Sequence, residues 1–424
     1  MDKSSLIYVL ISMQFFTSCQ NNDDSTLTAI ELQNEPPLSF ELTSVQDQAV
    51  NVELTPTLTW QSAKNPNGSD VTYDLYLDTH VNPSTLAEEN LNETSYELAQ
   101  NLFHLTPYYW KVIATDREGR TSQTTISNFT TRYYQFPEEP AIAATPFNAR
   151  SGHRIAIFDE KLWLSGGWNS GQRYNDVWYS MDGIAWENAT TTAAFSERSG
   201  HTSVVYDEKL WIIGGSENGI DGLRDVWYSS DGSTWDSATL NANFSRRSGH
   251  SSVVFDNKIW VIGGFDNGSV KKSDVWYSSN GVNWTRALAS APFSARSSHQ
   301  SVVYDNKIWV IGGVVGNTRK SDVWYSSNGT DWVEATDAAD FPARNAFQSI
   351  VFDNKIWVIG GFNGSQSFSD VWYSENGIDW VASQNTSAIG NRSGHEVHVF
   401  KNALWLIGGS VSGEGLQNDV WKME

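Results

Sequence analysis

The sequence predicts an all-β protein in which an N-terminal β-domain precedes six copies of a β-rich repeat. An arginine recurs at spacings of 48, 49, 49, 48 and 48 residues, at Arg150, Arg198, Arg247, Arg296, Arg344 and Arg392. A Gly-Gly pair and an Asp-Val-Trp triplet follow each arginine. Strand-length apolar runs separated by turn residues fill each repeat, which is typical of antiparallel sheets.

Each repeat is expected to form four antiparallel strands. In the third repeat, apolar runs at 252–255, 259–262 and 275–277 are followed by a short piece around Trp284, with turns such as Asn280-Gly281 between them. A sheet that is apolar on both faces must be covered on both sides. Six such sheets stacked around an axis cover one another, so we predict a β-propeller over residues 133–424.

The order of signature residues resembles the kelch motif. In five repeats a Tyr that follows the Gly-Gly pair is itself followed seven residues later by a Trp; the sixth repeat lacks this Trp. The resemblance implies a six-bladed kelch-type propeller. Since the sequence stops at Glu424, just after Asp419-Val420-Trp421, we expect residues 133–143 to pair with Val420-Trp421 and close the ring.

Residues 40–132 predict a separate β-sandwich. Alternating runs at 57–60, 73–77 and 109–114 are separated by turn residues. The segment resembles a fibronectin type III domain, with Trp60 in an early strand, an aromatic strand after Pro107 and a last strand at Phe129-Thr130-Thr131. We interpret this domain as a spacer.

The N-terminus predicts export. The apolar run from Leu6 to Phe16 has the length of a signal-peptide core and is too short to span a bilayer. Phe16-Thr17-Ser18-Cys19 resembles a bacterial lipobox, which implies a signal peptide at 1–18 and lipidation of Cys19. The polar stretch that follows resembles surface lipoproteins of Bacteroidetes-type bacteria. An ordinary signal peptide with an incidental cysteine is the alternative.

These features predict an exported protein that is lipid-anchored at the outer membrane or cell surface. Residues 19–39 are expected to form a flexible tether, and the lipid is expected to be the protein's contact with the membrane. We expect a monomer.

Composition excludes several functions. The chain carries 28 basic and 49 acidic residues, for a net charge of −21, which disfavours nucleic acid and anionic lipid as partners. Its single cysteine excludes an intramolecular disulfide and a Cys-rich zinc site. Five repeats place a histidine three residues after the arginine, but Phe347 interrupts this set. We therefore predict no metal and no cofactor.

The repeats also serve as an internal alignment. A residue present in every repeat is expected to support the fold, so the arginines are expected to be structural, for example by pairing with a neighbouring blade. Of the 18 tryptophans in the repeat region, Trp168 alone falls outside three recurring columns. Strand direction places the loops after Gly-Gly and the segments before each arginine on one face, face X, and the short turns on the opposite face, face Y.

The variable loops of face X provide the candidate ligand-binding residues. These are Trp168, Arg173, Tyr174, Asp221, Arg224, Phe265, Asp266, Arg319, Phe362, Asn363 and Phe368, with Lys271, Lys272 and Lys320 in the same loops. Aromatic, amide and charged groups on a rigid scaffold suit sugar stacking or protein recognition. Solvated loops with incidental aromatics are the alternative.

The kelch resemblance also raises enzymatic activity. Galactose oxidase has this propeller, but its copper site needs a tyrosine crosslinked to a cysteine, and no cysteine follows Cys19. A sialate mutarotase-like enzyme would need acid and base groups, which Glu217, Asp221 or Asp266 could match. We assign no catalytic residue and expect a non-enzymatic protein that binds a glycan; a protein-interaction scaffold and a sugar-active enzyme are the alternatives.

Overall fold

The computed structural model describes residues 35–134, 137–267, 270–383 and 388–423. The chain divides into two compact units, the first ending at Arg132 and the second beginning at Tyr133. The described residues form strands, turns and loops without a helix, so the all-β prediction is confirmed. Among them, no helix exists that could cross a membrane. Cys19, the predicted signal peptide and most of the tether lie outside the described residues.

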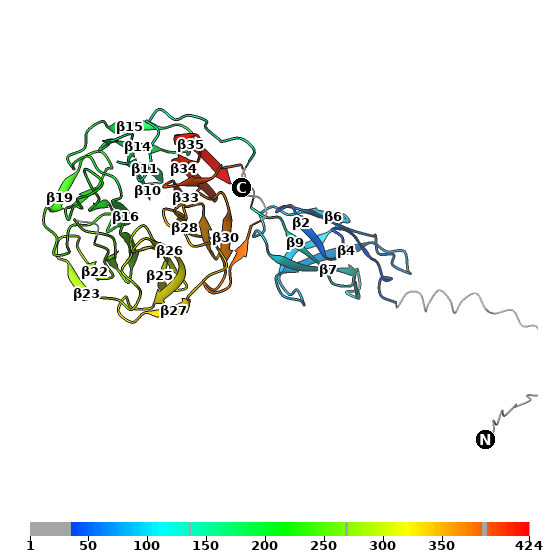
Figure 1. Cartoon of the computed structure of the whole chain (residues 1–424). Coiled ribbons are helices and arrows are strands. Elements are labelled where there is room, and N and C mark those ends of the chain that lie inside the picture. Colours follow the sequence, from blue (N-terminus) through cyan, green and yellow to red (C-terminus); the bar gives the residue numbers. More distant parts are fainter. Residues whose placement is uncertain (1–34, 135–136, 268–269, 384–387, 424) are drawn as a thin grey trace, which may run out of the picture. The chain divides into compact units, whose positions relative to one another are not determined.

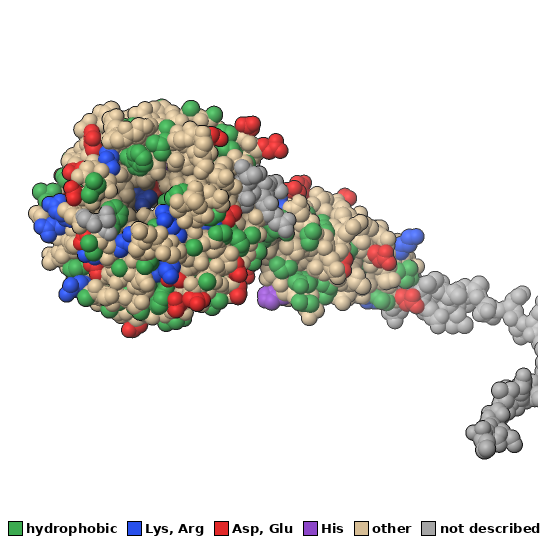
Figure 2. Space-filling view, viewed as in Figure 1, with side chains coloured by type: hydrophobic (Ala, Val, Ile, Leu, Met, Phe, Trp, Pro, Cys, Tyr) green, Lys and Arg blue, Asp and Glu red, His purple; other side chains and the backbone are tan. Residues whose placement is uncertain are grey.

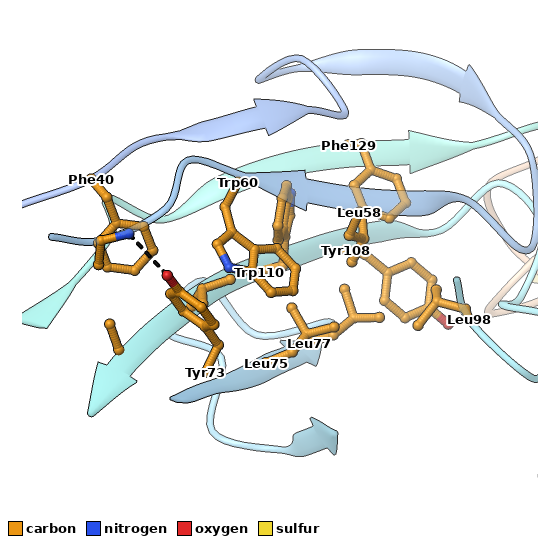
Figure 3. Packing of buried hydrophobic residues seen from close by; sticks show 13 residues of the cluster. Phe40, Leu58, Trp60, Tyr73, Leu75, Leu77, Leu98, Tyr108, Trp110 and Phe129 are labelled. Atoms are coloured by element: carbon orange, nitrogen blue, oxygen red, sulfur yellow. Dashed lines mark hydrogen bonds between the residues drawn. The ribbon is translucent and has the colours of Figure 1, made fainter. Parts of the chain in front are cut away.

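The first unit consists of two sheets around an aromatic core (Figure 3). In strand β7, alternate side chains are buried, including Trp110, which packs in the core with Trp60 and Tyr73. One sheet has the order β1-β3-β6 and the other β2-β9-β7-β4-β5, with β8 beside β7. The strands are β1 (Leu42–Ser44), β2 (Ala49–Val52), β3 (Thr57–Trp60), β4 (Val71–Asp78), β5 (Leu86–Leu91), β6 (Ser95–Glu97), β7 (Pro107–Asp116), β8 (Thr121–Gln123) and β9 (Ser127–Thr131).

The second unit contains six successive sheets, which we call blades one to six. Blade one comprises β10 (Arg154–Phe158), β11 (Lys161–Ser165), β14 (Val177–Ser180) and β15 (Glu187–Thr190), with a hairpin of β12 (Trp168–Asn169) and β13 (Gln172–Arg173). Blade two comprises β16 (Thr202–Tyr206), β17 (Lys209–Ile213), β18 (Val226–Ser229) and β19 (Asp236–Thr239). Blade three comprises β20 (Ser251–Phe255), β21 (Lys258–Ile262), β22 (Val275–Ser278) and β23 (Thr285–Leu288).

The remaining blades follow the same order. Blade four comprises β24 (Gln300–Tyr304), β25 (Lys307–Val315), β26 (Thr318–Ser326) and β27 (Val333–Thr336). Blade five comprises β28 (Gln348–Phe352), β29 (Lys355–Ile359), β30 (Val371–Ser374) and β31 (Val381–Ala382). Blade six comprises β32 (Arg392–Ser393), β33 (Glu396–Phe400), β34 (Ala403–Val411) and β35 (Gly415–Met423).

The blades form a closed ring, which makes the second unit a propeller (Figure 1). The innermost strand of each blade contacts that of the next, in the order β10, β16, β20, β24, β28 and β33, and β33 returns to β10. Recurring tryptophans fill the space between blades: Trp163 lies against Gly232 of blade two, where no β-carbon would fit. The predicted core columns therefore join neighbouring sheets as well as the strands of one sheet.

The ring is joined where the two ends of the repeat region meet. Ile142 exchanges backbone hydrogen bonds with Val420 of β35, at N···O distances of 3.1 and 2.8 Å. Tyr134 then packs edge-on against Trp357 of blade five, with ring centroids 4.7 Å apart. In the other blades a turn glycine of the following blade covers this tryptophan, as Gly377 covers Trp309. Residues 135–136 of the predicted closing segment 133–143 lie outside the described residues.

Candidate functional site

The long loops of the propeller share face X because the inner strand of each blade starts there and its antiparallel neighbour returns there. In blade one, β10 runs away from face X to the Asp159-Glu160 turn and β11 returns to Gly166-Gly167. The propeller is hollowed near its centre, and Lys, Arg and hydrophobic side chains gather around the hollow (Figure 2).

The recurring arginines are structural. Arg247 is fully buried, and its Nη1 and Nη2 donate to the two carboxylate oxygens of Asp274 at 3.1 and 2.9 Å, while Nη1 also donates to the carbonyl of Gly263. Because Asp274 belongs to the same blade, the expected pairing with a neighbouring blade is wrong. A buried charge needs such a complete set of partners. The same pairing joins Arg150–Asp176, Arg198–Asp225, Arg296–Asp322, Arg344–Asp370 and Arg392–Asp419.

The histidine column lies between blades. His201 of blade two is buried against Gly166 of blade one, and its Nε2 lies 3.2 Å from the Ser165 hydroxyl. Desolvation holds its pKa well below the ordinary range, so the ring is neutral. Phe347 occupies the same place against Gly312. A position that phenylalanine fills equally well serves interblade packing.

A closed circle of backbone hydrogen bonds surrounds the axis at face X. Its members follow each arginine by two residues, and each amide donates to the carbonyl of the preceding blade's member at 2.7–3.1 Å. They are Gly152, Gly200, Gly249, Ser298, Ala346 and Gly394, all with positive φ. Ser298 and Ala346 hold φ of 51° without being glycine, which the bonds from both neighbours enforce. We call this circle the axial ring.

Three aromatic side chains stand beside the axial ring in alternate blades. The residue directly after each Gly-Gly pair forms a backbone bridge with the residue after the arginine, as Trp168 does with Ser151. At this position blades one, three and five carry Trp168, Phe265 and Phe362, whereas blades two, four and six carry Ser216, Val314 and Ser410. Among all tryptophans of the chain, each of which is described, Trp168 alone is exposed, at 39%.

Two predicted ligand residues instead cover the buried arginines. The rings of Tyr174 and Phe368 lie 4.3 and 4.4 Å from the guanidinium carbons of Arg150 and Arg344. Such stacking stabilises a buried cation. Their rings therefore serve the scaffold, which the sequence could not show because the other repeats carry unrelated residues there.

Arg173 and Arg319 reach across to the loop of the next blade. Arg173 Nη2 lies so close to Gly219 that a β-carbon there would stand 2.5 Å away, and burial lowers the pKa of Arg173. Arg319 Nε donates to Asn345 Oδ1 at 3.1 Å, and its guanidinium lies 5.4 Å from the Phe362 ring centre. These two cations link neighbouring loops of face X.

The remaining predicted residues mostly have local partners. Asp221 accepts a hydrogen bond from Asn218 Nδ2 at 2.9 Å, and Asp266 pairs with Lys272 at 2.6 Å. Asn363 Oδ1 accepts from the amides of residues 365 and 366 and so closes its own turn. Arg224 donates through Nη2 to Asn241 at 3.0 Å.

Sequence reasoning missed a polar cavity of about 340 Å³ between the inner strands. Arg154 Nη1 donates to Glu396 Oε1 at 2.5 Å, and Gln348 Nε2 donates to the same oxygen at 2.7 Å. Burial would raise the pKa of Glu396, but Arg154 and His398 lower it to about 2. The three hydrogen-bonded residues Arg154, Gln348 and Glu396 belong to the column directly after the histidines. That column reads Arg154, Thr202, Ser251, Gln300, Gln348 and Glu396. Its variation between repeats was the signal that could have revealed it.

Comparisons with known proteins agree with this architecture. The KLHDC2/KLHL20/DRC7 Kelch-repeats domain matches residues 115–264 and 200–409. The solved structure titled "Structure of YjhT" is similar with a TM-score of 0.56 and 16% identity, over 67% of this chain and 99% of that one. At this identity the likeness shows the fold alone. No curated protein matches by sequence. The predicted kelch-type propeller is confirmed.

Proposed function

Because the chain belongs to the KLHDC2/KLHL20/DRC7 Kelch-repeats domain family, we propose that its propeller is a non-enzymatic binding module that presents face X to a glycan. A kelch propeller suits a binding or scaffold role, while the ligand depends on the site. Trp168 carries the proposal. Its indole is exposed, yet its backbone is fixed by two hydrogen bonds with Ser151, at 3.1 and 3.0 Å, and by the β12–β13 hairpin. An exposed aromatic ring on a rigid backbone suits stacking against a sugar ring.

The rest of the chain supports this role in our proposal. The six sheets are the blades of a complete kelch propeller, and the first unit is a fibronectin type III-like spacer. The sheet orders β1-β3-β6 and β9-β7-β4-β5 favour this assignment of the first unit. A lipid on Cys19 anchors the protein at the cell surface, where extracellular glycans are accessible.

A glycan array tests the proposal. The full chain carrying Cys19→Ala is applied to the array, together with the further substitution Trp168→Ala. An aromatic anchor at the centre of a small interface contributes ~2 kcal/mol or more, so Trp168→Ala is expected to weaken binding about thirtyfold. Ile378→Ala is the control, because Ile378 is also exposed, at 48%, but lies in a turn of face Y. Equal binding by both variants would refute the role of Trp168.

Incubation of each bound sugar with the protein tests the enzymatic alternative. Binding without chemical change supports the binding module. Conversion of the sugar would instead make the protein an enzyme and overturn the non-enzymatic proposal.

A protein ligand is the second candidate, favoured by exposed aliphatic side chains on face X. Ile220, Leu240 and Val270 of blades two and three are exposed at 61%, 59% and 55%. Exposed apolar side chains that form a contiguous patch are typical of protein-interaction surfaces. The test crosslinks the protein to its neighbours at the cell surface. A crosslinked partner protein that is lost in the Val270→Ser variant, together with no binding on the glycan array, would favour this candidate.

A further inference from the structure

A basic cleft lies on face X between blades two and three. It encloses about 530 Å³, and its lining includes four cations, Arg224, Lys271, Lys272 and Arg286. The chain as a whole has 49 acidic and 28 basic residues, so this grouping runs against the overall charge. Trp276 adds an aromatic surface to the lining.

The acid that lines this cleft cannot neutralise the cations. It is Asp274, whose carboxylate already accepts hydrogen bonds from Arg247 and from Trp276 Nε1. Both lysines have partners beside the cleft: Lys272 pairs with Asp266 at 2.6 Å, and Lys271 Nζ donates to the Gly316 carbonyl at 2.8 Å.

The two arginines keep most of their donors free. Arg224 uses Nη2 to bond Asn241, while its Nε is buried and has no partner among the described residues. The Arg286 guanidinium lies 5.8 Å from the Trp276 ring centre and is exposed to solvent. A guanidinium held over an aromatic ring keeps its N–H edge available to an anion.

The other repeats show that the scaffold does not need these arginines. Arg224 stands where the other blades carry Asn175, Ser273, Ser321, Ser369 and Asn418. Asn175 donates to the carbonyls of Ala193 and Phe195 and so fastens the segment that enters the next blade. Arg286 stands opposite Trp276, where the other blades place Asn188, Ser237, Glu334 and Ala382 opposite the equivalent tryptophan. The other blades therefore fold without an arginine at either position.

We propose that this cleft binds the anionic group of an acidic glycan, a uronate carboxylate or a sulfate ester. The inference rests on the proposed glycan binding and names the class of glycan. Arginine forms paired, charge-assisted hydrogen bonds with such planar or branched oxyanions, and Trp276 offers apolar surface to the sugar. The backbone bridge between Phe265 and Lys271 connects the cleft to the aromatic residues beside the axial ring. One extended glycan chain therefore contacts both the cleft and these aromatic residues.

The test replaces both arginines with residues that the chain itself uses at these positions, in the double variant Arg224→Asn and Arg286→Ser. Affinity is measured for polygalacturonate, its methyl-esterified neutral form, dextran sulfate and dextran, at two salt concentrations. The matched control is Lys161→Gln with Lys209→Gln, which removes the same charge from face Y. Thermal unfolding verifies that each variant folds.

The unmodified protein is expected to bind at least one acidic polymer about tenfold or more tightly than its neutral counterpart. The cleft variant is expected to lose about tenfold for each guanidinium and to show a weaker salt dependence. Polygalacturonate and dextran sulfate separate the carboxylate from the sulfate ester.

Different failures separate this inference from the proposed function. Equal affinity for acidic and neutral polymers, or unchanged binding by the cleft variant, would overturn the inference and leave glycan binding intact. Binding of none of these polymers, together with a silent array, would overturn both. Tighter binding of polyglutamate than of any polysaccharide would show that the cleft takes an acidic peptide instead.

Discussion

Acid is expected to destabilise the propeller through its buried histidines, and His395 provides the sharpest test. Desolvation and then the positive charge of Arg392 lower the pKa of His395 from 6.5 to about 3, although Glu396 acts in the opposite direction. Between these values the unfolded chain binds a proton that the folded chain does not. Stability is therefore complete above pH 6.5 and falls as the pH drops toward 3.

The size of the effect follows from this difference. At pH 5 one such histidine lowers the free energy of unfolding by about 2 kcal/mol relative to high pH. Burial lowers the pKa in the same direction for the other members of the column, His153, His201, His250 and His299. Each of the five therefore adds to the loss of stability in the same direction as the pH falls.

The assay compares urea unfolding at pH 7 and pH 5, followed by tryptophan fluorescence. His395→Phe is a suitable variant, because Phe347 already fills the equivalent place in blade five. The unmodified protein should lose about 2 kcal/mol more between the two pH values than the variant does. His80→Gln, at an exposed position of the first unit, is the control. Equal losses in the protein and the His395 variant would refute the reasoning.

Three further predictions concern the core, the closure and the anchor. Trp260→Ala is expected to lower the free energy of unfolding by ~3 to 5 kcal/mol because Trp260 is buried, whereas Trp168→Ala should change it by about 0.5 kcal/mol or less; chemical denaturation compares them, and similar losses would place Trp168 in the core. Tyr134→Ala exposes Trp357 and is expected to lower the free energy of unfolding by about 3 kcal/mol. An unchanged thermal midpoint would show that Tyr134 does not contribute to closure of the ring. Cys19→Ala should release the protein from the membrane fraction, and retention without fatty-acid labelling of the original protein would contradict the anchor.

The repeats made most of the propeller predictable, because identical columns must perform identical packing. The spacing of the arginines, Gly-Gly pairs and tryptophans predicts strands that the structure places where expected, such as Lys258–Ile262 around Trp260. The partner of each arginine was not predictable. The three-dimensional arrangement of the strands decides whether Asp274 or the equivalent aspartate of another blade reaches Arg247. Because every repeat carries this aspartate, the sequence alone is compatible with either pairing.

The candidate site was less predictable than the fold because variation between repeats has two causes. Tyr174 differs from its equivalents, yet its ring covers Arg150 and supports the scaffold. Trp168 differs from its equivalents as well, and its ring faces solvent. Only the three-dimensional neighbours of each ring distinguish a residue that supports the scaffold from one that is free to bind a ligand. The sequence placed Arg224, Lys271 and Lys272 in loops of face X but did not reveal that Arg286 joins them. Arg224 and Arg286 are 62 positions apart and come together through the stacking of two blades.

The axial ring determines which part of face X is free to recognise a ligand. Its six amides and carbonyls are already paired with one another, so the backbone nearest the axis has little hydrogen-bonding capacity left to offer. In the cavity between the inner strands, Glu396 accepts hydrogen bonds from both Arg154 and Gln348. Free donors and exposed aromatic surface begin outside the ring, at Trp168 and in the cleft of Arg224 and Arg286. Recognition on this propeller is therefore expected to run along the loops around the axis, where the six repeats differ most.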